Sequence, residues 1–232
     1  MAWLAPLPRL RRNIFCVGKN YDEHAMEFAR SGFDSASDPG QDIPEHPIIF
    51  TKAAETVIGP RASIEIPTGL TSQVDYEAEL AVVIGTSGRF IPRRRALDYV
   101  FGFTMINDIT ARDLQKRHKQ WFLGKSIETF CPMGPFIRTI DQIDLDDLIL
   151  EGHVNGELRQ SAPESAMIFD ISSIISTISQ SMMLLPGDVI ATGTPAGVGI
   201  GRSPPVFLKG GDSVSVSATG LGTLTDPVVG LS

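Results

Sequence analysis

Short apolar runs, each about the length of a β-strand, recur along the chain. The most informative is 76–84, where apolar residues surround Glu77 and Glu79 before Gly85 ends the run. Side chains alternate between the two faces of a strand, so Glu77 and Glu79 point to the same face. Apolar content and Gly or Pro boundaries predict further strands at 13–17, 47–52, 100–106 and 189–191, and a pair of strands within 206–229.

Helical patterns are fewer. Isoleucines at 171, 174, 175 and 178 fall on one helix face, which predicts a helix over 171–183 with Asp170 as its N-cap. Asn155-Gly156 between two extended runs predicts a type I′ hairpin turn. Strands outnumber helices without regular alternation, so we expect an α+β fold with a rolled, barrel-like mixed sheet, in one catalytic domain over 1–232. Other helices are predicted at 19–30, 93–99 and 109–118.

Composition narrows the classes of function. Hydrophobic residues make up 42% of the chain, enough for a sizeable core, and the formal net charge of −7 disfavours nucleic-acid and membrane-surface partners. No apolar run is long enough to span a bilayer. Cys16 and Cys131 have apolar neighbours and are expected to be buried free thiols, with a disulfide as the less favoured alternative. We therefore expect a cytoplasmic protein.

The two glutamates on one strand face require a compensating charge. Carboxylates crowded on an apolar strand repel each other, and their burial costs desolvation energy. A divalent cation held by hard oxygen ligands is the simplest compensation. A solvated strand face explains the same spacing, so from these residues alone the two interpretations remain open.

The segment 19–46 has the features of a lid. His24 and Glu27 lie three residues apart in a predicted helix, so they share a face and can form a hydrogen bond. Residues 31–46 are rich in Ser, Gly, Asp and Pro, which predicts a loop. A short helix next to a long polar loop is typical of a segment that closes over a site, so we expect a mobile lid.

Eight segments occur in a fixed order between residue 13 and about residue 229: CVGKNYDEHAMEF, IIFTKAAETVIGP, VDYEAELAVVIG, FGFTMINDITARDLQ, GKSIETFCPMGPFI, VNGELRQS, LLPGDVIATGTPAGVG and LKGGDSVSV. Together they resemble the fumarylacetoacetate hydrolase superfamily, in its short-chain branch of acylpyruvate and fumarylpyruvate hydrolases. No single segment is specific, but the ordered set is. Ala53 stands where proline is common in the family, and Ile127-Glu128 where Phe-Asp is common. The separate N-terminal domain of longer members has no counterpart among these segments.

The resemblance implies a metal site. Glu77, Glu79 and Asp108 match the family's metal carboxylates. Asp108 precedes a predicted helix, so a plain N-cap is the alternative interpretation of that residue. Three oxygen ligands leave positions open for substrate and water, which suits Mg²⁺ or Mn²⁺.

The resemblance also implies a catalytic group. His24 matches the general base that activates water, and Glu27 matches the partner that orients the base and stabilises its charged form. Lys125 matches the active-site lysine that faces a substrate oxygen or a developing enolate. Without the resemblance, a structural histidine and a surface lysine are the plainer interpretations.

Three more residues match substrate-binding positions. Arg112 and Gln115 match positions that contact substrate or brace the metal site, and Thr194 matches the threonine that holds the substrate carboxylate. For Gln115 a surface position is the alternative, and for Thr194 a simple Gly/Pro turn.

The resulting hypothesis is Mg-dependent hydrolysis of a C–C bond in an acylpyruvate- or fumarylpyruvate-type 1,3-diketo acid, which releases pyruvate and a carboxylic acid. His24 would activate water, and the cation and Lys125 would stabilise the departing enolate. Alternatives that use the same enolate are decarboxylation of oxaloacetate, isomerisation and a lyase step. A non-enzymatic metal or small-acid binding protein is disfavoured by the His24/Glu27 pair. The family also implies a homodimer.

Overall fold

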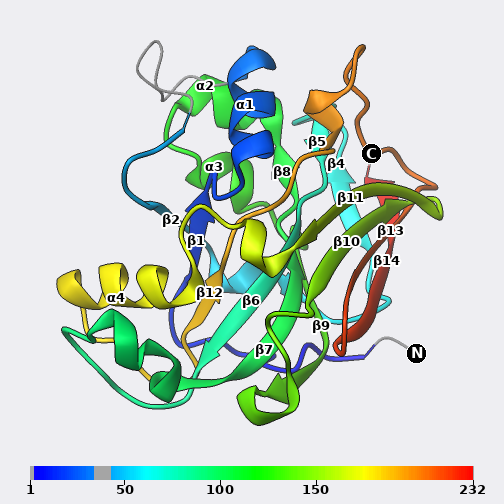
Figure 1. Ribbon diagram of the computed structural model, residues 1–232. Helices are drawn as coiled ribbons and strands as arrows, with labels where there is room; N and C mark the ends of the chain where they lie inside the picture. Colours follow the sequence, from blue (N-terminus) through cyan, green and yellow to red (C-terminus); the bar gives the residue numbers. More distant parts are fainter. Residues whose placement is uncertain (1–2, 34–42, 232) are drawn as a thin grey trace.

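The computed structural model describes residues 3–33 and 43–231, and β-strands form most of its regular structure (Figure 1). The strands are β1 (Ile14–Gly18), β2 (Ile48–Lys52), β3 (Val57–Ile58), β4 (Ile64–Pro67), β5 (Val74–Asp75), β6 (Ala78–Ile84), β7 (Val100–Asn107), β8 (Thr110–Ala111), β9 (Cys131–Thr139), β10 (Ile149–Val154), β11 (Glu157–Pro163), β12 (Val189–Ala191), β13 (Ser213–Ala218) and β14 (Gly222–Leu231). A seven-stranded sheet has the order β2-β1-β12-β6-β7-β9-β3, and a five-stranded sheet the order β11-β10-β13-β14-β4. Strands β5 and β8 form a small third sheet. Parallel and antiparallel pairs both occur, so the sheets are mixed.

The helices are short and lie outside the sheets. The α-helices are α1 (Asp22–Arg30), α2 (Arg112–His118), α3 (Phe122–Lys125) and α4 (Ile171–Ser181). The 3₁₀ helices are η1 (Ala54–Thr56), η2 (Arg93–Tyr99), η3 (Ile140–Gln142), η4 (Glu164–Ala166) and η5 (Gly199–Gly201). Figure 1 shows α1, α2 and α3 at one end of the seven-stranded sheet and α4 farther along it. Within the described ranges, no helix has the length and apolar content needed to cross a membrane.

The predicted fold class is confirmed: the structure is α+β, with a curled mixed sheet and few helices. Asn155 and Gly156 have φ angles of 53° and 78°, as a type I′ turn requires. The Asp170 carboxylate accepts a hydrogen bond from the Ser173 amide at 2.7 Å, so the predicted N-cap is also confirmed, although α4 ends at Ser181.

The helix predicted over 93–99 is present as a 3₁₀ helix, and the helix predicted over 19–30 begins at Asp22. One helix prediction needs a larger correction. The helix predicted over 109–118 begins only at Arg112, because Thr110 and Ala111 pair with β5 as strand β8. Asp108 therefore lies before β8 and is not the N-cap of α2, which removes the plainer interpretation of that residue.

Packing of the two main sheets positions the central strand β6. Every residue of β6 is buried. The largest apolar cluster is formed by side chains of β1, β6, β7, β10, β13, β14 and α4. In the β6–β7 register Ala78 lies opposite Asn107, and the Asp108 amide donates to the Glu77 carbonyl at 2.8 Å. The beginning of β6 and the end of β7 are thereby fixed side by side.

Candidate active site

Three carboxylates meet where β6 begins and β7 ends. Glu77, Glu79 and Asp108 are all buried, and each offers an oxygen within 4.8 Å of those of the other two. Ligands at 2.0–2.1 Å from Mg²⁺ can be at most about 4.2 Å apart, so a small contraction would let these oxygens share one ion. The predicted set of metal ligands is thus brought together.

Three buried cations surround these carboxylates. Lys125 Nζ lies 2.6 Å from Glu77 Oε2 and 2.5 Å from Asp108 Oδ2, so one ammonium group bridges two proposed ligands. Lys52 Nζ lies 2.8 Å from Asp108 Oδ1, and Arg112 Nη2 lies 2.7 Å from Glu77 Oε1. An ion bound by Glu77 and Asp108 would share their oxygens with these groups.

The third carboxylate, Glu79, has a different environment. Its Oε2 accepts a hydrogen bond from the Gly193 amide at 2.9 Å. Burial, with repulsion from Asp108 and Glu77, raises the pKa of Glu79 well above its ordinary value. Burial also opposes ionisation of Glu77, but Lys125 lowers the pKa of Glu77 to about 2. A divalent cation beside Glu79 would relieve the repulsion, so the donor set fits such an ion.

The formal charges also favour an anionic ligand once an ion is bound. The buried groups at the cavity and its ion pairs comprise four carboxylates and four cations, so −4 and +4 leave a formal charge of 0. A divalent ion would change this to +2 and would favour an anionic acid as ligand. The groups are Asp75, Glu77, Glu79 and Asp108, and Lys19, Lys52, Arg112 and Lys125.

Helix α1 lies across this cluster. His24 is buried, and its Nδ1 lies 3.3 Å from Glu27 Oε2, so the predicted pair forms. Because Nδ1 faces Glu27, Nε2 is the ring nitrogen available to a ligand. Lys19, His24 and Phe28 of the predicted lid, 19–46, therefore line one cavity with the carboxylates. Residues 34–42 of that prediction lie outside the described residues.

The cluster opens into a narrow cavity of about 20 Å³. This volume holds about one or two water molecules, so a substrate can enter only if α1 or the surrounding side chains move. Any residue with a side chain at position 18 would collide with the aromatic wall, because a Cβ at Gly18 would lie 2.4 Å from the Trp121 ring. The cavity is lined by Val17, Gly18, Lys19, His24, Glu77, Glu79, Arg112, Gln115, Lys125 and Thr194, and by the aromatic rings of Phe28, Phe50 and Trp121.

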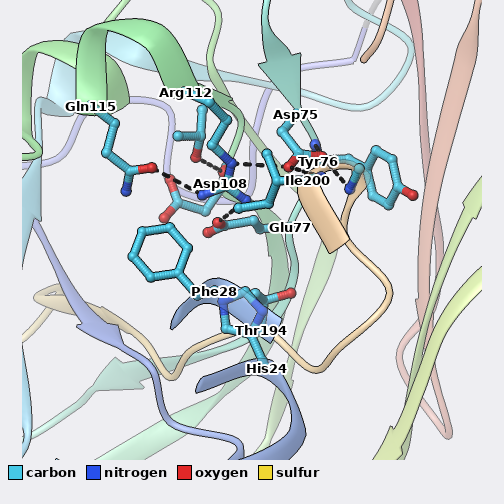
Figure 2. Close-up of polar contacts among 12 residues, drawn as sticks. His24, Phe28, Asp75, Tyr76, Glu77, Asp108, Arg112, Gln115, Thr194 and Ile200 are labelled. Atoms are coloured by element: carbon cyan, nitrogen blue, oxygen red, sulfur yellow. Dashed lines mark hydrogen bonds and ion pairs between the residues drawn. The ribbon is translucent and has the colours of Figure 1, made fainter. Parts of the chain in front are cut away.

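Arg112 and Gln115 brace the cluster from α2 (Figure 2). Arg112 Nη1 donates to Gln115 Oε1 at 3.1 Å, while Arg112 Nη2 contacts Glu77. Both side chains are buried, so the alternative that Gln115 is a surface residue is wrong. Of the two predicted roles for Arg112, these contacts favour bracing the metal site.

Thr194 lines the cavity but its hydroxyl group is engaged. It donates to the Ala78 carbonyl at 2.9 Å and accepts from Gln160 Nε2 at 2.7 Å. These two bonds attach the segment after β12 to the start of β6 and to Gln160 of β11. The predicted role of Thr194 in holding a substrate carboxylate would require one of them to be exchanged.

Two buried residues of the cluster are not among the predicted site residues. Lys52 ends the apolar strand β2, and its Nζ contacts Asp108 and donates to the Ile109 carbonyl at 2.9 Å. Asp75 accepts from Arg112 Nε at 2.9 Å (Figure 2). A lysine that ends an apolar run is a weak signal for Lys52, and the parity that Asp75 shares with Glu77 is a clearer one.

The two departures from the family pattern lie outside the cavity. Glu128 is exposed, and Ile127 is partly buried against a second apolar cluster, which includes Phe130. The Ala53 amide donates to Ser126 Oγ at 3.0 Å. None of these three residues lines the cavity, so they leave its walls unchanged.

Comparisons with known proteins agree with this geometry. The family described as fumarylacetoacetate (FAA) hydrolase C-terminal matches residues 13–229. Oxaloacetate tautomerase YisK of Bacillus subtilis is 50% identical over 225 residues, which are 97% of this chain and 72% of that protein.

Two solved structures are also similar. A fumarylacetoacetate hydrolase from Exiguobacterium antarcticum has a TM-score of 0.86 and 47% identity, covering 98% of this chain and 78% of that one. A 2-hydroxyhepta-2,4-diene-1,7-dioate isomerase from Mycobacterium marinum has a TM-score of 0.79 and 40% identity, covering 98% and 77%. The chain therefore belongs to the fumarylacetoacetate hydrolase superfamily, a family of enzymes, as its motifs predicted.

Proposed function

We propose that this protein is a metal-dependent enzyme that interconverts the keto and enol forms of oxaloacetate or a closely similar 2-oxo dicarboxylic acid. The observation that carries the proposal is the buried cluster of Glu77, Glu79 and Asp108, in which Lys125 bridges Glu77 and Asp108 and His24 lines the same cavity. Its relative YisK is named an oxaloacetate tautomerase, which supports this substrate. Mg²⁺ or Mn²⁺ is the expected ion, held by the three carboxylates.

Each residue has a distinct part in the proposed reaction. The ion, when bound, would supply Lewis-acid polarisation of the 2-oxo group. His24 removes a proton from C3 of the keto form, and Glu27 stabilises the imidazolium that results. The ammonium group of Lys125 stabilises the negative charge that develops on the enolate oxygen. His24 then returns the proton to that oxygen, so the enol forms without loss of atoms.

Hydrolysis of a C–C bond in a diketo acid is the second candidate. The pairing of His24 with Glu27 at 3.3 Å favours it, because the same base can take a proton from water. Water would then attack the distal carbonyl, and the pyruvate enolate would leave toward Lys125. The two candidates differ in products, since only hydrolysis releases a carboxylic acid.

The decisive experiment follows the ultraviolet absorbance of enol-oxaloacetate with Mg²⁺ and then with EDTA. We expect Mg²⁺-dependent acceleration of enol loss, and Glu77→Gln should reduce the rate at least about 100-fold. Asp188→Asn is the matched control, because Asp188 is a buried carboxylate that caps the Leu185 amide away from the cavity. An enol-to-keto rate unaffected by the enzyme would refute the proposal.

Product analysis separates the two candidates. Acetylpyruvate or fumarylpyruvate is incubated with the Mg²⁺-loaded enzyme, and released acid is measured by NMR. We expect little release, whereas rapid release with no effect on oxaloacetate would establish hydrolysis instead. His24→Asn should reduce whichever reaction occurs by about 10²-fold or more while Mg²⁺ binding persists.

A further inference from the structure

The loop 197–201, which contains η5, contacts both helix α1 and the Asp75 carboxylate of the buried cluster. From the side of α1, Glu27 accepts a hydrogen bond from the Gly197 amide at 3.1 Å. A Cβ at Gly201 would lie 1.6 Å from Glu27 Oε1, so the helix rests directly on this loop. The position of α1 therefore depends on the conformation of the loop.

Asp75 holds the same loop from the side of the cluster. Its fully buried carboxylate accepts from the Gly199 amide at 2.7 Å, the Ile200 amide at 3.2 Å and Arg112 Nε at 2.9 Å (Figure 2). The Tyr76 amide is a fourth donor, at 2.9 Å. A carboxylate with four donors cannot turn toward one of them without leaving another unsatisfied in the interior.

Arg112 completes the connection to the proposed metal ligand. Its Nε binds Asp75, and its Nη2 lies 2.7 Å from Glu77 Oε1. Ile200 packs with Phe28 of α1 in a separate apolar cluster, so the loop also meets the helix through apolar contact. Contacts thus run without a break from α1 through the loop, Asp75 and Arg112 to Glu77.

We propose that Asp75 is a positioning residue that couples the seating of α1, which carries His24, to the orientation of Glu77 toward the metal. This inference rests on the proposed metal site. Because the loop amides and Arg112 share one carboxylate, a shift of the loop moves Arg112, and a shift of Glu77 moves the loop. Coupling of this kind is reciprocal: metal binding tightens α1, and release of α1 weakens metal binding.

Trp121 provides a reporter for α1. Its ring forms an edge-to-face contact with Phe28 at a centroid distance of 6.0 Å, and it is largely buried. The other tryptophan, Trp3, is exposed and can be replaced in a Trp3→Phe background. Acrylamide quenching of Trp121 fluorescence, measured while Mg²⁺ is titrated, then reports metal affinity and α1 seating together.

In this background we expect Mg²⁺ to protect Trp121 from quenching. Asp75→Asn places an amide where only an acceptor fits, so Mg²⁺ affinity should fall about tenfold and the Mg²⁺-dependent protection should disappear. Asp212→Asn is the control, because Asp212 is a buried carboxylate that accepts from the Lys209 amide and Asn155, away from the cluster. It should leave Mg²⁺ affinity and protection unchanged.

A second pair of variants tests the coupling from the opposite end. Gly201→Ala displaces Glu27 without touching a carboxylate of the cluster, and it should also weaken Mg²⁺ binding several-fold. Gly69→Ala is its control, since a Cβ there meets no atom within 4 Å. This pair retains the test if Asp75→Asn fails to fold.

The outcomes separate the coupling from the proposed function. If the reference protein binds Mg²⁺ but Asp75→Asn and Gly201→Ala bind it equally well, the coupling is refuted and the metal site stands. If the reference protein does not bind Mg²⁺, the metal site falls and the coupling falls with it. If Asp212→Asn lowers Mg²⁺ affinity and Trp121 protection as much as Asp75→Asn does, Asp75 contributes only to general stability and the coupling is refuted.

Discussion

Glu77 and Asp226 are both buried carboxylates, one beside the seven-stranded sheet and one in the five-stranded sheet. Burial raises the pKa of Asp226 to about 7, although the amides of Arg61 and Ala62 oppose the rise. Burial acts in the same direction on Glu77, yet Lys125 lowers its pKa to about 2. Among the described residues, no side chain forms an ion pair with Asp226.

The contrast shows what keeps the charge of the cluster in place. Desolvation alone drives a buried carboxyl toward its neutral form, as at Asp226. At Glu77 the chain buries Lys125 and Arg112 together with the carboxylate, which keeps it ionised and able to act as a metal ligand. The cations, more than the carboxylates, distinguish the candidate active site from an ordinary buried acid.

Replacement of Lys125 should have the largest effect, because Lys125 is the main group that keeps Glu77 ionised while Asp226 has no such partner among the residues that the structure describes. Lys125→Met leaves Glu77 and Asp108 without their shared cation, so the free energy of unfolding in EDTA should fall by about 3–5 kcal/mol. Mg²⁺ should restore part of the loss, because it supplies positive charge at the same oxygens. Urea denaturation with and without Mg²⁺ measures both effects. The exposed Lys209→Met is the control, and an equal loss there would contradict the prediction.

The raised pKa of Asp226 predicts a pH dependence of stability. Between about pH 4 and pH 7 the folded protein retains a proton on Asp226 that the unfolded chain has released, so stability declines as pH rises through this range. The decline attributable to this group is up to about 4 kcal/mol. Unfolding measured across this range should show a flatter profile in Asp226→Asn. An unchanged profile would mean that folding does not raise the pKa of Asp226.

The smallest effect is expected at Asp170, a partly exposed carboxylate. Burial is the largest single influence and opposes its charge, but hydrogen bonds from Arg93 and Ser173 together lower its pKa. Asp170→Ala removes the N-cap of α4 and should cost about 1 kcal/mol. Thermal unfolding should detect this loss, while the kinetics with oxaloacetate stay unchanged. A loss as large as that of Lys125→Met would show that burial is not what separates these carboxylates.

The sequence predicts the features that depend on neighbouring residues. The alternation that pairs Glu77 with Glu79, the Asp170 cap and the Asn155-Gly156 turn all arise within a few residues, so the pattern reveals them. Asp226 follows the same rule, because it shares the buried parity of Leu224 and Val228 in β14.

Features that depend on distant partners could not be predicted in this way. Asp75 acquires its role from Arg112, 37 residues away, and from Gly199, 124 residues away. Lys52 meets Asp108 only because the strands that carry them converge at one end of the sheet. No local pattern encodes such contacts, and the family resemblance covers ligands and catalytic groups but not these supports.

The position of β12 between β1 and β6 has a consequence for protein synthesis. Strand β12 pairs with both, and its residues are 189–191, so the N-terminal strand cannot join the central sheet until most of the chain has left the ribosome. Until then the acidic residues that start β6 lack part of their surroundings, including the Gly193 amide. Assembly of this centre is therefore a late event, and nascent chains that stall before it should be targets for chaperones and proteases.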